Sequence, residues 1–157
     1  MPVLEFVTQI QAPIEICFDV ARNIDIHKAS TAESKEEAIG GVTSGLIGPG
    51  DEVTWRATHF GIRQKLTSVI TGFQFPYYFR DEMTEGPFKR IKHDHLFEEK
   101  DGITVMRDRF EFESPLGVFG RIFNSLVLNK YMRSLIVKRN RVLKTHAESL
   151  YINAKQP

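Results

Sequence analysis

Alternation of apolar and polar residues covers most of the first 113 positions and predicts β-strands. The expected strands lie at 3–10, 36–42, 53–59, 62–70, 77–83 and, as a pair joined by a turn, within 90–113. Such alternation places every second side chain on one face, which is typical of antiparallel strands with one buried face. Turn signals separate the strands at Phe60-Gly61, at FQFP (73–76), at EGP (85–87) and at Asp101-Gly102.

Helical spacing replaces the alternation in two places. Pro13 suits the first turn of a short helix, because the amide hydrogen it lacks would have no partner there, and Asn23 is a good N-cap for a second one. From about Leu116 to about Ser149, apolar residues recur at spacings near three and four. This pattern predicts one long helix, or two pieces with a bend near Asn129.

These elements predict an α+β fold. We expect a curved antiparallel sheet of about seven strands wrapped around the long C-terminal helix, with two short helices after the first strand. The C-terminal helix is the only element large enough to cover the inner face of the sheet. A sheet curled around one helix commonly leaves a cavity between them.

Composition narrows the class of protein without indicating a partner. The 157 residues are 41% hydrophobic and carry a formal net charge of +1, which suits one domain spanning residues 1–157 with a sizeable core. The single Cys17 excludes an internal disulfide and fits a reducing compartment. No signal peptide is recognisable, and no apolar stretch approaches the ~20 residues of a membrane helix. We expect a cytoplasmic protein without integral membrane association, of unknown oligomeric state.

Titratable residues share the apolar phase of the last two strands. His93 and His95 lie in that phase on the first strand, and Asp108 lies in it on the second. A turn centred on Asp101-Gly102 sets His95 opposite Asp108, whereas a slip of two residues sets His93 there. Asp81, on the preceding strand, should lie beside the histidine strand. Buried polar groups need partners, and these side chains can supply one another.

Four interpretations of this polar group remain open. It is either a satisfied core pair, or the polar end of a ligand cavity, or a general acid–base pair of His95 and Asp108 that acts on a carbonyl compound, or a metal site. In the metal site, Asp108 and Asp81 would complete the ligand shell of the two histidines. The last two have less support, because a pair alone defines no oxyanion hole and His-x-His is a common sequence. No metal or other cofactor is therefore predicted.

Large apolar side chains in the inner phase would form either plain core or the wall of a pocket. Together with the polar residues they make up the candidate ligand-binding set: Trp55, Gln64, Ser68, Phe79, Asp81, His93, His95, Phe97, Met106, Asp108 and Phe110. The segment GLIGPG (45–50) lacks the Lys-Ser/Thr ending of a phosphate-binding loop. We expect it to form a flexible edge of the cavity entrance.

Charged residues follow two further patterns. The opposite strand phase interleaves both signs, which is typical of a solvated face with weak ion pairs; its members are Arg56, Arg63, Lys65, Arg80, Lys92, Arg107, Arg109, Glu52, Glu82, Asp94, Glu98 and Glu111. Positions 121–147 hold no acid, and their cations are Arg121, Lys130, Arg133, Lys138, Arg139, Arg141 and Lys144. These cations either form the wet face of an amphipathic helix or attract anionic lipid. No nucleic-acid motif is present, so no nucleic-acid partner is predicted.

The order of elements resembles the helix-grip fold of the START and birch-pollen-allergen superfamily, also called SRPBCC or polyketide-cyclase-like. Four segments are similar to one bacterial branch, labelled ligand-binding or cell-division-inhibitor-like: GDEVTWRATHFG (50–61), FRDEMTEGPF (79–88), HDHLFEEKDGITVMRD (93–108) and SPLG (114–117). The resemblance runs from residue 4 to about residue 148. It implies the fold but no particular reaction or catalytic residues, because the superfamily includes carriers, receptors, cyclases and chaperone regulators.

We therefore predict that the chain binds a small hydrophobic or amphipathic molecule between the sheet and the C-terminal helix. A lipid fragment, a polyketide-like aromatic or an isoprenoid would suit such a site. One alternative is an enzyme of the cyclase, dehydratase or isomerase kind, with His95 and Asp108 as its acid–base pair. The other is an accessory protein that docks on a membrane or a partner through its basic C-terminal helix.

Overall fold

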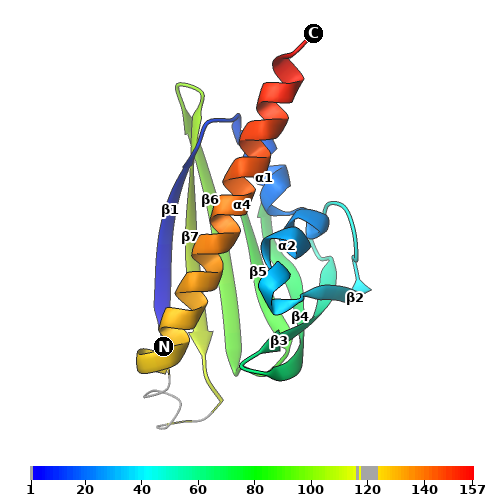
Figure 1. Ribbon diagram of the computed structural model, residues 1–157, viewed down its shortest axis with the longest axis vertical. Coiled ribbons are helices and arrows are strands. Elements are labelled where there is room, and N and C mark those ends of the chain that lie inside the picture. The colour runs from blue at the N-terminus through cyan, green and yellow to red at the C-terminus, as the bar shows by residue number, and fades with distance from the viewer. Residues whose placement is uncertain (1, 116, 118–123) are drawn as a thin grey trace.

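A seven-stranded antiparallel sheet dominates the computed structural model, which describes residues 2–115, 117 and 124–157. The strands run in the order β1-β7-β6-β5-β4-β3-β2, so that β2 to β7 form a meander and β1 pairs with β7 (Figure 1). Their bounds are β1 (Val3–Ile10), β2 (Glu37–Gly41), β3 (Glu52–His59), β4 (Ile62–Gln74), β5 (Tyr78–Glu85), β6 (Arg90–Lys100) and β7 (Ile103–Glu113). The predicted strands and their order are confirmed.

The long helix α4 (Asn129–Lys155) lies diagonally across one face of the sheet, with α1 (Ile14–Ala21) and α2 (Ile24–Ser30) beside it (Figure 1). It contacts α1, α2 and β1. A 3₁₀ turn, η1 (Ala32–Ser34), follows α2, and a π-helical turn, η2 (Asn124–Leu128), leads into α4. The predicted start of the long helix near Leu116 lies outside the described residues. The predicted irregularity near Asn129 coincides with the change from π- to α-helix.

The helix starts follow from local chemistry. Pro13 is the N-cap of α1, where its missing amide hydrogen leaves no donor unpaired. The side-chain oxygen of Asn23 accepts hydrogen bonds from the amides of Asp25 (2.9 Å) and Ile26 (3.2 Å). Both predicted helix starts are therefore confirmed. Each was predicted from one residue, Pro13 for α1 and Asn23 for α2.

The β6–β7 hairpin sets the register of the inner face. Asp101 and Gly102 both have positive φ, 55° and 77°, as a two-residue turn of this kind requires. Centred on this turn, His95 pairs with Asp108 and His93 with Phe110. The first of the two predicted registers is the correct one.

Core packing is concentrated at the two ends of the inner face. At the α1 end, the Phe18 ring meets the Phe73 and Phe79 rings edge-on, each with centroids 5.3 Å apart. A second buried cluster includes Phe6, Phe112 and Ile136. Among the described residues, no helix is long and apolar enough to cross a membrane.

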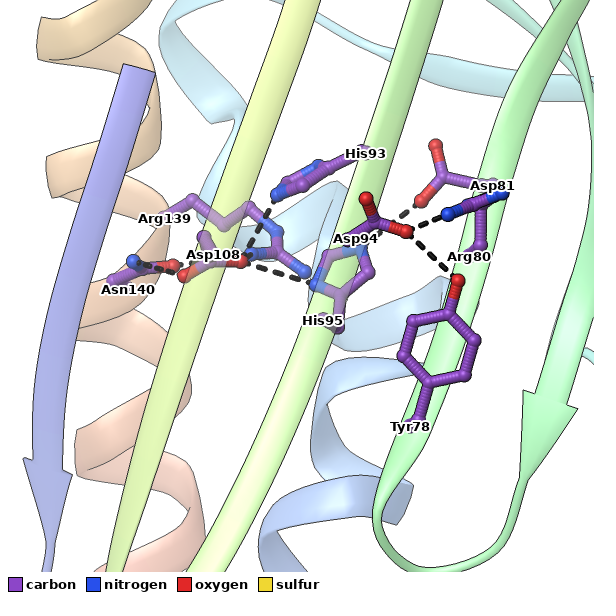
Figure 2. Close-up of polar contacts among 9 residues, drawn as sticks. All are labelled: Tyr78, Arg80, Asp81, His93, Asp94, His95, Asp108, Arg139 and Asn140. Carbon is purple, nitrogen blue, oxygen red and sulfur yellow. Dashed lines mark hydrogen bonds and ion pairs between the residues drawn. The ribbon is translucent and has the colours of Figure 1, made fainter. Parts of the chain in front are cut away.

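The outer face is less solvated than the alternation of charges predicted. Asp94 is only 5% exposed, because Tyr78 OH and Arg80 Nε both donate to its Oδ1, at 2.8 Å and 2.6 Å (Figure 2). Glu111 is also 5% exposed, and Lys92 Nζ lies 3.8 Å from its Oε1. The prediction of a solvated face with weak ion pairs is wrong for these two carboxylates, since long side chains on neighbouring strands lie over them.

Candidate functional site

A cavity of about 600 Å³ lies between the inner face of the sheet and the helices α2 and α4. Its walls are mostly apolar, with Val53, Ile70 and Phe110 from the sheet and Ile24 and Ile136 from the helices. The loop at 45–50 contributes Ile47 to the wall. This volume falls within the range of sites that enclose small molecules, roughly 300–1,000 Å³.

The predicted ligand-binding residues divide into two groups. Eight line the cavity: Trp55, Gln64, Ser68, Phe79, Asp81, His93, His95 and Phe110. The other three, Phe97, Met106 and Asp108, are not among the lining residues. Phe97 and Met106 belong to the core cluster around Phe18, and Asp108 lies behind the two histidines.

A polar cluster lies at one side of the cavity; we define it as Asp81 of β5, His93 and His95 of β6, Asp108 of β7, and Arg139 and Asn140 of α4 (Figure 2). Asp108 and Asn140 lie behind the four members that line the cavity. His93 Nε2 lies 2.9 Å from Asp108 Oδ1, and His95 Nε2 lies 2.9 Å from Asp81 Oδ2. His95 Nδ1 also lies 3.1 Å from Asp108 Oδ1, so that both histidines contact this carboxylate although only His95 is opposite it in the ladder. The two imidazole rings are 3.8 Å apart between centroids.

Asp108 is the centre of this cluster. It is 2% exposed, and its Oδ2 accepts a hydrogen bond of 2.8 Å from Asn140 Nδ2. Arg139 Nη1 lies 3.5 Å from its Oδ1. Burial opposes ionisation of Asp108, but the hydrogen bond from His93, the close contact of His95 and the charge of Arg139 outweigh it and hold the pKa well below its usual range.

The two histidines have different protonation properties. Burial, together with the neighbouring His95, lowers the pKa of His93 to about 4. His93 is therefore neutral near pH 7 and donates its Nε2 hydrogen to Asp108, which leaves a lone pair on Nδ1. Burial also opposes the charge on His95, but its contacts with Asp108 and Asp81 raise its pKa. His95 thus has a carboxylate at each ring nitrogen.

A second set of polar side chains lines the cavity near α2. His27 Nε2 lies 2.8 Å from Glu36 Oε2, and the His27 ring packs against Trp55 with centroids 4.4 Å apart. His59 Nδ1 lies 2.6 Å from Tyr131 OH, which ties the β3–β4 hairpin to α4. All five side chains line the cavity.

Two residues of the polar cluster, Arg139 and Asn140, are absent from the set predicted from the sequence. Both alternatives for the basic helix expect Arg139 to be exposed, but it is 7% exposed and turned toward Asp108. That expectation is wrong because Arg139 and Asn140 lie three and four residues after Ile136 and so continue its buried stripe. This spacing was the signal that could have identified both.

The rest of the basic helix is partly paired. Lys138 Nζ lies 2.6 Å from Glu33 Oε2, and Lys144 Nζ lies 3.2 Å from Glu148 Oε1. Arg133 lies over the Phe6 ring, 5.2 Å from its centroid, and Arg121 is outside the described residues. These contacts weaken the sequence-based argument for a membrane-docking helix.

Comparisons with known proteins identify the fold. No family model matches the sequence, and no curated protein is similar to it in sequence. A Thermus thermophilus protein has a similar structure, with a TM-score of 0.77 and 18% identity, over 99% of this chain and 100% of that one.

Two further structures agree. A START superfamily protein from Mycobacterium smegmatis has a TM-score of 0.71 at 11% identity, covering 94% of this chain and 98% of its own. A major latex-like protein from Panax ginseng has a TM-score of 0.67 at 14% identity, covering 93% and 97%. At these identities the likeness concerns the fold alone. The chain thus has the helix-grip fold that is found in START superfamily proteins.

Proposed function

We propose that this protein binds a small hydrophobic or amphipathic molecule in the cavity between the sheet and α4. The observation that carries the proposal is the cavity itself, about 600 Å³ with mostly apolar walls. Empty apolar volume of this size destabilises a fold, because the side chains around it lose packing contacts. A ligand that fills the cavity restores these contacts and removes its own apolar surface from water.

The polar cluster supports an amphipathic ligand rather than a pure hydrocarbon. Asp81, His93 and His95 line the same cavity as the apolar residues, so that one side of the bound molecule meets hydrogen-bonding groups. A single hydroxyl or carbonyl group on the ligand would pair there and fix its orientation, while the apolar walls provide most of the affinity.

Binding has more support than acid–base catalysis by His95 and Asp108. Asp108 does not line the cavity, and both ring nitrogens of His95 face carboxylates. A general base needs a free lone pair within hydrogen-bonding reach of the substrate. Such a reaction would need His95 to leave one of its carboxylates first.

Native mass spectrometry of freshly purified protein tests the proposal directly. We expect a small apolar or amphipathic molecule to remain bound and to be released when the protein unfolds. Repeated absence of a passenger, together with no binding of the amphipathic dye 1-anilinonaphthalene-8-sulfonate, would contradict the proposal.

Two substitutions at neighbouring positions locate the binding. Ala57 lines the cavity, whereas Thr58 is exposed on the other face of β3. Ala57→Leu should weaken dye binding by about tenfold, equivalent to about 1.4 kcal/mol, because the larger side chain occupies cavity volume. Thr58→Leu adds an apolar side chain outside and should leave the affinity unchanged. Equal effects of the two changes would place the dye elsewhere.

A further inference from the structure

We propose that Asp81, His93 and His95 form a binding site for a divalent transition-metal ion in the cavity wall. Each offers one ligand atom, and these three atoms lie within 4.8 Å of one another. The proposal goes beyond ligand binding and does not depend on it.

The sheet brings the three side chains together. His93 and His95 are two residues apart on β6, so both rings point to the inner face. Asp81 pairs with His93 across the β5–β6 ladder. Two imidazoles and one carboxylate bind one face of an ion and leave its other positions open, here toward the cavity that all three residues line.

A second layer of contacts suits metal-binding histidines. Such histidines almost always donate their second ring N–H to a carboxylate, which fixes the ring and its tautomer. Asp108 Oδ1 lies at this position for both rings: His93 Nε2 hydrogen-bonds to it at 2.9 Å, and His95 Nδ1 lies 3.1 Å from it, without hydrogen-bonding geometry. It is itself held by Asn140 and Arg139 on α4. These contacts leave His93 Nδ1 and His95 Nε2 as the ring atoms that an ion would bind.

The contact between His95 Nε2 and Asp81 Oδ2, at 2.9 Å, joins two of these ligand atoms. A metal ion would replace the hydrogen that the two atoms share, and that proton would leave to solvent.

The charges of the cluster also suit a metal ion. Once the shared proton has left, Asp81 and Asp108 carry two negative charges against one positive charge on Arg139, so the dication lies in a net negative site. Imidazole ligands favour Zn²⁺ or Fe²⁺, whereas Ca²⁺ and Mg²⁺ prefer oxygen ligands.

Titration of the chelator-treated full chain with Zn²⁺, and with Co²⁺ as an optical probe, tests this site. We expect one ion per chain, and ligand-field absorption in the visible range from bound Co²⁺. Asp81→Asn and His93→Gln should each weaken binding by more than about tenfold, and Asp108→Asn by about 10–100-fold through loss of ring positioning. The matched controls are Asp101→Asn in the β6–β7 turn and His146→Gln on α4, both exposed. Both should bind as the unsubstituted chain does.

An NMR measurement on the unsubstituted chain tests the proposal even if a variant of the polar cluster fails to fold. In NMR spectra of the histidine ring nitrogens, Zn²⁺ should move the signals of His93 and His95 and leave those of His146 in place. The proposal is overturned if Zn²⁺ moves neither signal, if the chain binds no ion, or if Asp81→Asn and His93→Gln bind as tightly as the controls. In that case the group is a polar core cluster that binds no metal, and the ligand-binding proposal is unaffected.

Discussion

A single buried carboxylate, Asp108, organises the polar side of the cavity. Four side chains contact its two oxygens, and they come from two sequence-distant elements, β6 and α4. Removing one member of such a group is expensive because the others stay buried without their partner. Arg139 is the member most affected, since its positive charge is 7% exposed.

We therefore expect Asp108→Asn to lower the free energy of unfolding of the metal-free protein by about 3 kcal/mol, because Arg139 loses its countercharge. Urea denaturation measures this change. The control Asp101→Asn places the same substitution in an exposed turn where Asn tolerates the positive φ of 55°, and should change stability by less than about 0.5 kcal/mol. Similar values for the two variants would show that Asp108 is not a stabilising centre.

The buried thiol of Cys17 gives a second prediction at this scale. Burial raises its pKa to about 11, so at neutral pH almost none of it is thiolate, the reactive form. Iodoacetamide should modify native protein far more slowly than protein unfolded in urea, as mass spectrometry can follow. Complete modification of the native protein within the time needed for the unfolded one would contradict this assignment.

Among the elements, β5 and β6 carry a polar group on each face. On the inner face they hold Asp81, His93 and His95, and on the outer face Asp94 with Tyr78 and Arg80 (Figure 2). Burial opposes ionisation of Asp94, yet the hydrogen bonds from Arg80 and Tyr78 lower its pKa. The outer group therefore ties the two strands together beneath the cavity wall.

Asp94→Asn should destabilise the protein by about 1–2 kcal/mol. The amide is a weaker partner for Arg80 than the carboxylate, and its own NH2 group would be buried without a good acceptor. The matched control is Glu37→Gln, which removes the charge from an exposed ion pair of the same length, 2.6 Å to Arg56. Because solvent screens that pair, Glu37→Gln should change stability far less than Asp94→Asn does. Urea denaturation distinguishes the two, and equal losses would mean that Asp94 behaves as a surface charge.

In the molecule as a whole, the cavity lowers the stability of the fold and provides the space for a ligand. A fold that keeps about 600 Å³ between its sheet and its main helix gives up packing energy that a filled core would supply. Ala57→Leu, which should weaken dye binding, should therefore raise the stability of the ligand-free protein by about 1 kcal/mol. Thr58→Leu should not. Thermal and urea unfolding measure the effect, and destabilisation by Ala57→Leu would mean that the space beside Ala57 is already occupied.

Local patterns identified most of the architecture. The alternation of β6 and β7 and the turn at Asp101-Gly102 restricted the residue opposite Asp108 to His95 or His93, and the structure has His95 there. Asn23 marked the start of α2 in the same way. In each case the contacts that form the element join residues close in sequence. Residue types and their spacing are therefore enough to predict it.

Residue spacing was enough to predict the strands and helices, the side chains that face inward, and the shared face of two histidines and two aspartates. The partners of these polar side chains depend on tertiary packing. Arg139 and Asn140 reach Asp108 because α4 crosses the sheet at that point, and Asp94 is buried because Tyr78 and Arg80 lie over it. The volume left between sheet and helix is likewise a tertiary property. It depends on sheet curvature and on the position of α4, which no short stretch of sequence encodes.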